Sequence, residues 1–237
     1  MTTGADTDRP FRVALWGARS VGKTSALAAY VCHTKPAWID TADHETTGAT
    51  VKTLLEKWNP FANKQLPFAT IEISAYRLRH KSSGRMIELW DVRGGGTEAL
   101  DQGELNVLNG CDAVIHFVSW PSGEVRPLVA LNNAIAAAGH KPAALVLTKV
   151  ESHLRLEEVG LFLYNPIDMA KKHRFPQELV RAMSTKCRGH VYPISVFGYG
   201  SDLLPAYVID EFARPLPWGV APLNVHLPFD DVLGAIS

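Results

Sequence analysis

The sequence predicts a three-layer α/β sandwich, in which helices cover both faces of a mostly parallel sheet with one antiparallel hairpin strand. Short apolar runs alternate along the chain with segments of helical periodicity, and this order is typical of parallel sheets. Two adjacent strand patterns are separated by residues 81–85, a polar stretch with one glycine that predicts a hairpin. With 237 residues, 46% of them hydrophobic, the chain is long enough to bury one sizeable core.

The pattern begins with a short apolar run at residues 11–16, FRVALW, which stops at a glycine as a buried strand does. A helix is expected at 24–32, followed by a loop at 34–43 that contains Pro and Trp. Residues 45–58 have apolar side chains at helical spacing and end at an Asn-Pro pair, so they predict a second helix.

The hairpin is expected to consist of two strands. Residues 70–80 alternate apolar and polar side chains, and residues 86–92 form the β-favouring run MIELWDV. A helix at 97–109 and a buried strand at 113–119, AVIHFVS, are expected next. His116 lies within that apolar strand, and we interpret it as a core histidine with satisfied hydrogen bonds rather than as a ligand.

The remainder of the chain continues the alternation of helices and strands. Gly139 is a suitable cap after one expected helix, and Pro176 is placed to open another. The expected elements are a helix at 128–138, a strand at 143–148, a helix at 177–187, a strand at 191–195 and a final helix at 230–236.

The pattern predicts one domain at 11–237, preceded at 1–10 by a flexible polar tail without signal-peptide features. The extra length at about 34–69 is interpreted as an insertion packed onto that domain. Residues 203–237 are expected to form a Pro-rich C-terminal extension. No window approaches 18 consecutive apolar residues, so no membrane span is predicted.

Charge and cysteine usage narrow the expected partners. Lys plus Arg equals Asp plus Glu at 24 each, which removes the simplest argument for broad binding to nucleic acid or to an anionic membrane. We therefore expect no nucleic acid partner and no membrane insertion. Three cysteines stand far apart without metal-binding spacing, which predicts reduced thiols in a cytoplasmic protein: Cys32, Cys111 and Cys187.

The strongest functional signal is at residues 17–24, GARSVGKT, which fit GxxxxGK[ST] between an expected buried strand and an expected helix. Glycines let backbone N–H groups turn toward phosphate oxygens, and the helix start adds the positive end of its dipole. Lys23 then supplies a charge to the β- and γ-phosphates, while the Thr24 hydroxyl reaches magnesium. The sequence therefore predicts a P-loop NTPase fold that binds a nucleoside triphosphate and Mg²⁺ through Gly17, Arg19, Ser20, Val21, Gly22, Lys23, Thr24 and Ser25.

A second phosphate element is expected where the strand at 86–92 ends. Asp91 stands there, and Gly94 occupies the third position after it. An aspartate in this place can hold a magnesium-bound water, and the glycine can offer its N–H to the γ-phosphate. Because an aspartate also ends many strands in an ordinary turn, the pattern gains its meaning from the phosphate loop that precedes it.

With these motifs the chain resembles the small Ras-like GTPases of the translation-factor-related P-loop class. The resemblance implies a magnesium-binding switch threonine at the start of the hairpin, where Thr70 stands. Thr46, Thr47 and Thr50 compete for this role from a helical context, and an ordinary strand threonine is the alternative. The Pro-rich tail is also similar to that of bacterial GTPase-like domains found in conflict or stress systems.

The resemblance implies base recognition directly after the strand that ends at Thr148. The family pattern is [NT]KxD, and this chain has Thr148, Lys149 and Glu151, whose carboxylate is one methylene further out than an aspartate's. In the family the Lys stem lies over the base, and the carboxylate accepts from guanine N1–H and the exocyclic amine, which rejects adenine. GTP and GDP are therefore the implied ligands. Ser195 and Val196 resemble the Ser-Ala loop that offers a backbone N–H to the guanine oxygen.

The chain departs from the family at two positions. Ras-like enzymes place a Gln directly after the DxxG glycine, whereas this chain has Gly95, which has no side chain to orient water. Arg19 occupies a position beside the γ-phosphate that is Gly in the family, and it is either an internal arginine finger or a solvent-facing side chain. The catalytic candidates are Lys23, Arg19, Gly94 and Gly95, and the missing group would come from Arg93, Glu98, Gln102 or a partner.

These features favour a GTP-binding molecular switch with slow or partner-stimulated hydrolysis. GTP is expected to order the segments around Thr70 and Gly94–Gly96, and hydrolysis to release them and change binding of a protein effector or activating partner. The alternatives are a non-hydrolysing nucleotide-binding scaffold and an ATPase or small-molecule kinase that uses the same loop. The implied magnesium ligands are Thr24, Thr70 and Asp91.

Overall fold

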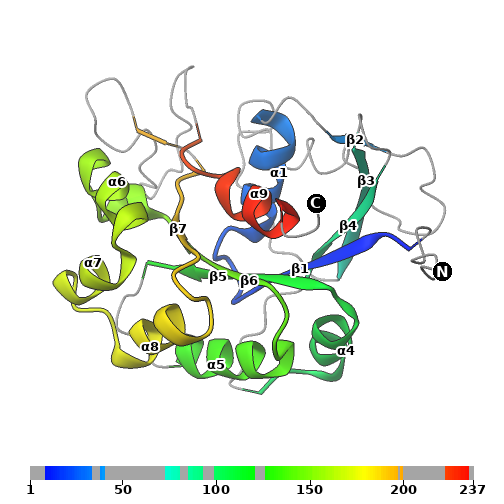
Figure 1. Ribbon diagram of the computed structural model, residues 1–237, viewed down its shortest axis with the longest axis horizontal. Helices are drawn as coiled ribbons and strands as arrows, with labels where there is room; N and C mark the ends of the chain where they lie inside the picture. Colours follow the sequence, from blue (N-terminus) through cyan, green and yellow to red (C-terminus); the bar gives the residue numbers. More distant parts are fainter. Residues whose placement is uncertain are drawn as a thin grey trace, which may run out of the picture.

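The computed structural model describes residues 9–33, 38–40, 73–80, 85–92, 99–120, 126–196, 198–199 and 222–234. Its sheet has seven strands in the order β2-β3-β4-β1-β5-β6-β7. Among the strands of these ranges, β3 alone runs in the direction opposite to the others. The predicted three-layer sandwich, with a mostly parallel sheet and one antiparallel hairpin strand, is therefore confirmed (Figure 1).

The bounds of the elements follow the apolar runs and the caps of the sequence. The strands are β1 (Phe11–Gly17), β2 (Trp38–Asp40), β3 (Ser74–His80), β4 (Met86–Asp91), β5 (Ala113–Ser119), β6 (Ala143–Thr148) and β7 (Val191–Pro193). The helices are α1 (Lys23–His33), α4 (Gln102–Gly110), α5 (Arg126–Ala138), α6 (Leu156–Tyr164), α7 (Pro166–Lys172), α8 (Gln177–Thr185) and α9 (Leu227–Gly234), with a short 3₁₀ turn, η2 (Val150–Ser152).

Helices cover the two faces of the sheet in two groups (Figure 1). On one face α1 and α9 close a core in which the rings of Tyr30 and Phe229 stack, with centroids 4.3 Å apart. The other face carries α4, α5 and α8, together with α6 and α7, over a core that includes Leu108 and Leu131. Because burial of apolar surface is the main favourable term in folding, these two cores hold the three layers together.

The central strand β1 determines where the candidate site lies. It is parallel to β4 on one side and to β5 on the other, with Leu15 opposite Asp91 and Gly17 opposite Phe117. Strand β6 runs in the same direction and ends at Thr148. Loops at the carboxyl ends of parallel strands form the ligand sites of open α/β folds. The topology therefore brings the loops after Gly17, Asp91 and Thr148 to one edge of the sheet.

The structure corrects several predicted elements. The loop expected at 34–43 contains β2, because residues 38–40 pair with β3 at the edge of the sheet. Helices α6 and α7 are additional to the predicted elements. The side chain of Asn165 caps α7 and Pro166 stands at its first turn, a helix-start signal that the sequence carries. The helix expected at 45–58 lies outside the described residues.

Several boundaries also differ from the predicted ones. Helix α4 begins at residue 102 rather than 97, because Asp101 and Glu104 form a capping box that sets its first turn. Helix α9 begins at residue 227 rather than 230, and α5 at 126 rather than 128. Strand β3 begins at residue 74 rather than 70, β7 ends at 193 rather than 195, and α8 ends at 185 rather than 187.

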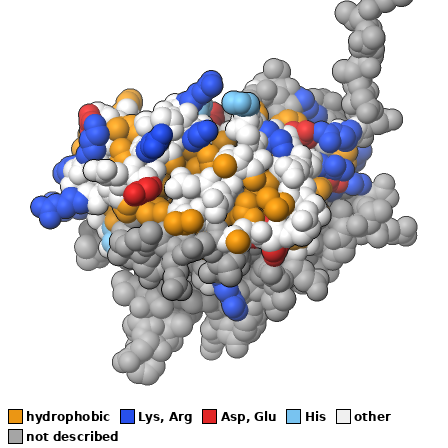
Figure 2. Space-filling model, turned by 90° about the horizontal axis from the view of Figure 1, so that it is seen from below, with side chains coloured by type: hydrophobic (Ala, Val, Ile, Leu, Met, Phe, Trp, Pro, Cys, Tyr) orange, Lys and Arg blue, Asp and Glu red, His pale blue; other side chains and the backbone are white. Residues whose placement is uncertain are grey.

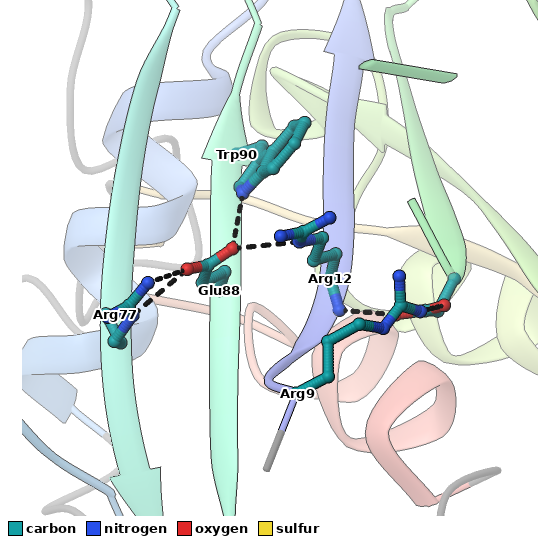
Figure 3. A network of polar contacts seen from close by, with 6 residues as sticks. Arg9, Arg12, Arg77, Glu88 and Trp90 are labelled. Atoms are coloured by element: carbon teal, nitrogen blue, oxygen red, sulfur yellow. Dashed lines mark hydrogen bonds and ion pairs between the residues drawn. The ribbon is translucent and has the colours of Figure 1, made fainter. Parts of the chain in front are cut away.

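Glu88 of β4 is the centre of a polar network that joins three strands (Figure 3). Its carboxylate accepts from Arg12 Nε at 3.1 Å, Arg77 Nε at 3.0 Å and Trp90 Nε1 at 3.2 Å. Burial alone would raise its pKa, but the hydrogen bonds from Arg77, Trp90 and Arg12 and the Arg77 charge outweigh burial and hold the pKa of Glu88 below its ordinary value. The network therefore ties β1, β3 and β4 together with partners that are matched in charge.

His116 lies in the core, as expected, but without the expected hydrogen bonds. Its side chain is fully buried in β5 and makes an edge contact with Trp16, with ring centroids 6.0 Å apart. Neither ring nitrogen has a partner among the described residues. Burial lowers the pKa of His116 to about 3, so the imidazole is neutral in the folded protein at neutral pH. The prediction of a satisfied histidine is therefore wrong.

The surface of the face formed by α5 and α8 carries basic side chains at separate points. Figure 2 shows Lys and Arg there among apolar and neutral residues, without one continuous band. No helix in the described part of the chain is long and apolar enough to cross a membrane. Cys111 and Cys187 are buried free thiols, and burial raises the pKa of Cys187 to about 12, which keeps that thiol protonated.

Candidate functional site

The loop between β1 and α1 has the backbone that the glycine-rich motif requires. A Cβ on Gly17 would lie 2.4 Å from the carbonyl oxygen of Phe117 on the neighbouring strand, so only glycine fits there without a shift. Ser20 and Gly22 have φ angles of 62° and 98°, in the left-handed region that favours glycine. Helix α1 starts directly after this turn, with Ala26 N–H donating to the carbonyl of Gly22 at 2.9 Å.

Lys23 is folded back onto the loop. Its ammonium donates to the carbonyl of Gly17 at 2.8 Å and to that of Ala18 at 3.2 Å, and the residue is only 5% exposed. Burial lowers the pKa of Lys23, while the charges of Asp91 and Glu104 act in the opposite direction. A buried cation that is held by two backbone carbonyls, with no carboxylate contact among the described residues, is suited to pair with an incoming phosphate.

Thr24 and Asp91 meet beside Lys23. The Thr24 hydroxyl donates to Asp91 Oδ2 at 2.5 Å, and Asp91 is fully buried at the end of β4. Hydroxyl and carboxylate oxygens are the hard ligands that Mg²⁺ prefers, and this ion usually takes few protein ligands because it keeps waters and phosphate oxygens. The pair therefore fits a magnesium ion. No cluster of three His, Cys, Asp or Glu side chains suited to a metal occurs in the described ranges.

Thr148 connects the expected base loop to the phosphate loop. It is 2% exposed, and its hydroxyl donates to the carbonyl of Val21 at 2.6 Å. The next residue, Lys149, has a φ of 59°, a backbone conformation that is uncommon for residues other than glycine. This turn starts η2, which contains Glu151. The predicted base-recognition residues therefore begin at the contact with the phosphate loop: Thr148 makes the contact, and Lys149 and Glu151 come directly after it in the chain.

Glu151 is a buried carboxylate beside Ser195. It is 7% exposed, and its Oε2 has no hydrogen-bond partner among the described residues. Burial raises the pKa of Glu151, and a hydrogen bond from Ser195 and the charge of Lys149 oppose that rise only in part. A buried acceptor without a partner is costly, and the cost is relieved by a ligand that donates to it.

The backbone N–H, the carbonyl and the hydroxyl of Ser195 all have hydrogen-bond partners within the protein. Its N–H donates to the carbonyl of Leu223 at 3.1 Å, and its carbonyl accepts from Leu223 N–H at 2.8 Å. Its hydroxyl oxygen accepts from Gly198 N–H at 2.7 Å. Two residues are expected to offer a backbone N–H to a base. Of these, Val196 is the one whose N–H has no backbone partner among the described residues.

The remaining predicted residues divide into two groups. Arg19 is exposed and Ser25 is partly buried in α1, so the loop presents the Arg19 side chain to solvent. Gln102, a candidate replacement for the missing glutamine, bonds Asn106 Oδ1 at 2.9 Å on the surface of α4. The predicted residues that lie outside the described ranges are Thr70, Arg93, Gly94, Gly95 and Glu98.

Two buried residues near the phosphate loop were not predicted. Trp16, which directly precedes Gly17 in the chain, donates from its Nε1 to Glu104 Oε1 at 3.3 Å. The Asp-x-x-Glu spacing at 101–104 is a capping-box signal, which identifies Glu104 as a helix-start residue. No pattern in the sequence indicates that this carboxylate is buried against the phosphate loop strand.

Comparisons with known proteins add only a general likeness of fold. No protein-family model and no curated protein matches the chain. Among solved structures, the chain is similar to a bacterial selenocysteine-specific elongation factor, with a TM-score of 0.44 and 16% identity over 79% of this chain. The chain spans 26% of the length of that protein. Because the likeness is this low, the functional case rests on the geometry of the site.

Proposed function

We propose that the chain is a guanine-nucleotide-binding switch that requires Mg²⁺ and hydrolyses GTP slowly or with the help of a protein partner. The observation that carries the proposal is the hydrogen bond from Thr148 to the Val21 carbonyl, 2.6 Å long. It ties the base loop to the phosphate loop in the buried interior, as one ligand with a base at one end and phosphates at the other requires.

The phosphate end follows from three neighbouring side chains. Lys23 would leave the carbonyls of Gly17 and Ala18 for the β- and γ-phosphates, which gives its buried charge a fully charged partner. Thr24 and Asp91 would hold Mg²⁺, which would neutralise charge on the phosphates when bound. Thr70 is the proposed third protein ligand.

The base end follows from Glu151, Lys149 and Val196. The unpartnered Oε2 of Glu151 would accept from guanine, whose N1–H and exocyclic amine are adjacent donors, whereas adenine presents an acceptor at N1. Val196 N–H would donate to the guanine oxygen, and the Lys149 stem would cover the base. Discrimination then comes from one buried carboxylate oxygen, Oε2 of Glu151, which stays without a partner when the wrong base is bound.

Slow hydrolysis follows from what the chain lacks at the γ-phosphate. Gly95 provides no side chain to orient water, and Arg19 is exposed. A partner would therefore supply or position the missing group, and GTP would order the segments around Thr70 and Gly94–Gly96 for recognition by an effector. The cytoplasm remains the predicted compartment.

Nucleotide titrations test the proposal directly. In the presence of Mg²⁺, GTP and GDP are expected to bind. ATP should bind at least about tenfold more weakly, because it cannot make the hydrogen bond to the charged Glu151 carboxylate. Equal affinities for GTP and ATP would contradict guanine recognition and favour the ATPase or kinase alternative. Asp91→Asn should weaken the effect of Mg²⁺ on GTP affinity more than it weakens binding without the metal.

Hydrolysis measurements separate the switch from a non-hydrolysing scaffold. Slow single-turnover release of phosphate from bound GTP is expected, and no release under any condition, including with cell extract as a source of partners, would favour the scaffold. Arg19→Ala should leave the single-turnover rate unchanged if the side chain faces solvent. A large fall in that rate would identify an internal arginine finger.

A further inference from the structure

Glu104 is a buried carboxylate that the proposed nucleotide contacts do not use. It is 3% exposed in the first turn of α4, where its Oε2 accepts from Asp101 N–H at 2.9 Å and its Oε1 from Trp16 Nε1 at 3.3 Å. A capping box needs only the first of these contacts, and it works at the protein surface. Burying a carboxylate is costly unless its oxygens are paired, and here the contact with Trp16 supplies the second pairing, which helix capping does not require.

The partner of Glu104 lies next to the phosphate loop. Trp16 is 2% exposed and directly precedes Gly17, whose carbonyl accepts from the Lys23 ammonium. The negative charge of Glu104 also acts on Lys23, as the pKa of that ammonium indicates. One side chain of α4 therefore contacts the strand that leads into the phosphate loop, and its charge acts on the cation of the loop.

The first turn of α4 also approaches the hairpin at the residue before β3. A Cβ on Gly103 would lie 3.7 Å from Ile73 Cδ1, so the first turn of the helix lies close to the start of β3. In sequence, Ile73 follows Thr70 closely and α4 follows Gly94–Gly96. The first turn of α4 thus lies beside Ile73, which follows the proposed switch threonine by three positions in the sequence.

We propose that Glu104 is a positioning residue that couples helix α4 to the phosphate loop through its hydrogen bond with Trp16. This inference rests on the proposed nucleotide-binding function. When phosphates take Lys23 from the Gly17 carbonyl, the end of β1 loses one of its contacts, and Glu104 transmits the change to the first turn of α4. Conversely, the position of α4 sets how firmly the loop holds nucleotide, because coupling between sites is reciprocal.

The variant Glu104→Gln separates this role from capping. Its single amide oxygen can still accept from Asp101 N–H, while its NH₂ group cannot accept from the Trp16 indole. Trp16→Phe removes the indole donor and leaves the capping box. The chain also offers a matched control, since Glu158 occupies the same capping position in α6, where it accepts from Arg155 N–H at 3.2 Å.

The test measures the dissociation rate of a fluorescent GDP analogue and the thermal unfolding of each variant. Glu104→Gln and Trp16→Phe are each expected to speed release about fivefold, the low end of typical coupling between sites. The double variant is expected to release no faster than the single variants, because both remove the same link. Glu158→Gln should leave the release rate at the wild-type value.

Three results with the variants would overturn the inference alone. If Glu104→Gln releases the GDP analogue at the wild-type rate, the role of Glu104 is limited to helix capping. Additive effects in the double variant would show that Trp16 and Glu104 act independently, and equal acceleration by Glu158→Gln would show a general loss of stability. A chain that binds no guanine nucleotide in direct titration would overturn the proposed function together with this inference, whereas binding with unchanged release in Glu104→Gln contradicts the inference alone.

Discussion

The Thr148 hydroxyl donates to the carbonyl of Val21 at 2.6 Å, a contact between residues 127 positions apart. Thr148→Val keeps the shape of this buried side chain and removes the donor, which leaves the Val21 carbonyl without this partner. We expect a loss of about 1–3 kcal/mol in the free energy of unfolding and weaker GDP binding, since the two loops are no longer held together. Chemical denaturation and nucleotide titration measure the two effects.

Thr148→Ser is the control for that change, because it retains the hydroxyl and removes only a methyl group. Its GDP affinity should stay close to the wild-type value. If the Val variant binds GDP as tightly as the Ser variant, the contact has no part in nucleotide binding.

Gly17→Ala should damage the site through steric contact alone. The new Cβ would lie 2.4 Å from the Phe117 carbonyl oxygen, so β1 and β5 must shift at the entrance to the phosphate loop. Such overpacking typically costs about 1–3 kcal/mol, and nucleotide binding should fall with it.

Gly160→Ala provides the matched substitution with the opposite expectation. A Cβ on Gly160 of α6 would meet no atom within 4 Å, and alanine in a helix is favoured by up to about 1 kcal/mol over glycine. The midpoint temperature of thermal unfolding should therefore fall for Gly17→Ala and rise for Gly160→Ala. Equal and small shifts would contradict the tight approach at Gly17.

Glu151 predicts an acid limit for guanine binding. Burial raises the pKa of its carboxyl above the ordinary 4.5, and only the ionised form accepts two donors from guanine. Affinity for GDP should therefore fall as the pH drops through this raised pKa. The GDP phosphates titrate as well, so the measurement is the ratio of affinities of wild type and Glu151→Ala at each pH. A ratio that does not change between neutral and acid pH would contradict the role of the carboxylate.

His116 predicts a loss of stability in acid. Its pKa is about 3 in the folded protein and 6.5 ordinarily, so below pH 6.5 the unfolded chain binds a proton that the folded protein does not. The free energy of unfolding should fall by up to about 1.4 kcal/mol per pH unit between these two values from this group alone. Above pH 6.5 it contributes no pH dependence.

His116→Leu isolates this contribution. Denaturant unfolding of the variant should show a smaller decline between pH 6.5 and 4 than the wild type, with the difference attributable to the imidazole. The variant should also gain stability at neutral pH, because two buried nitrogens without partners are removed. Identical pH profiles would show that His116 finds hydrogen-bond partners in solution.

Much of the fold could be predicted because its strands are buried on both faces. Runs such as 113–119 and 143–148 are mostly apolar, and their predicted bounds agree with β5 and β6. By contrast, β2 has three residues, and its strand conformation depends on pairing with β3 rather than on its own sequence. Helices α6 and α7 are short, so their periodicity is a weak signal; the Asn165 cap with Pro166 marks the start of α7, whereas Arg155 before α6 makes no side-chain cap.

The site could be predicted where chemistry depends on residue type at fixed spacing. The phosphate loop motif led to Lys23 and Thr24, and its strand context led to Asp91, which the fold brings within 2.5 Å of the threonine hydroxyl. Glu104 and Trp16 could not be found in this way, because they are far apart in the sequence and only the packing of α4 against β1 brings them together. The roles of Thr70 and Gly95 remain predictions.

The span of chain between Val21 and Thr148 also has a consequence for synthesis. At roughly 5–20 residues per second, the 127 positions between them correspond to about 6–25 s of translation. During that interval the new phosphate loop lacks its anchor, and the pairing of Ser195 with Leu223 forms later still. Under the proposed function, nucleotide binding therefore becomes possible only after Leu223 has been synthesised.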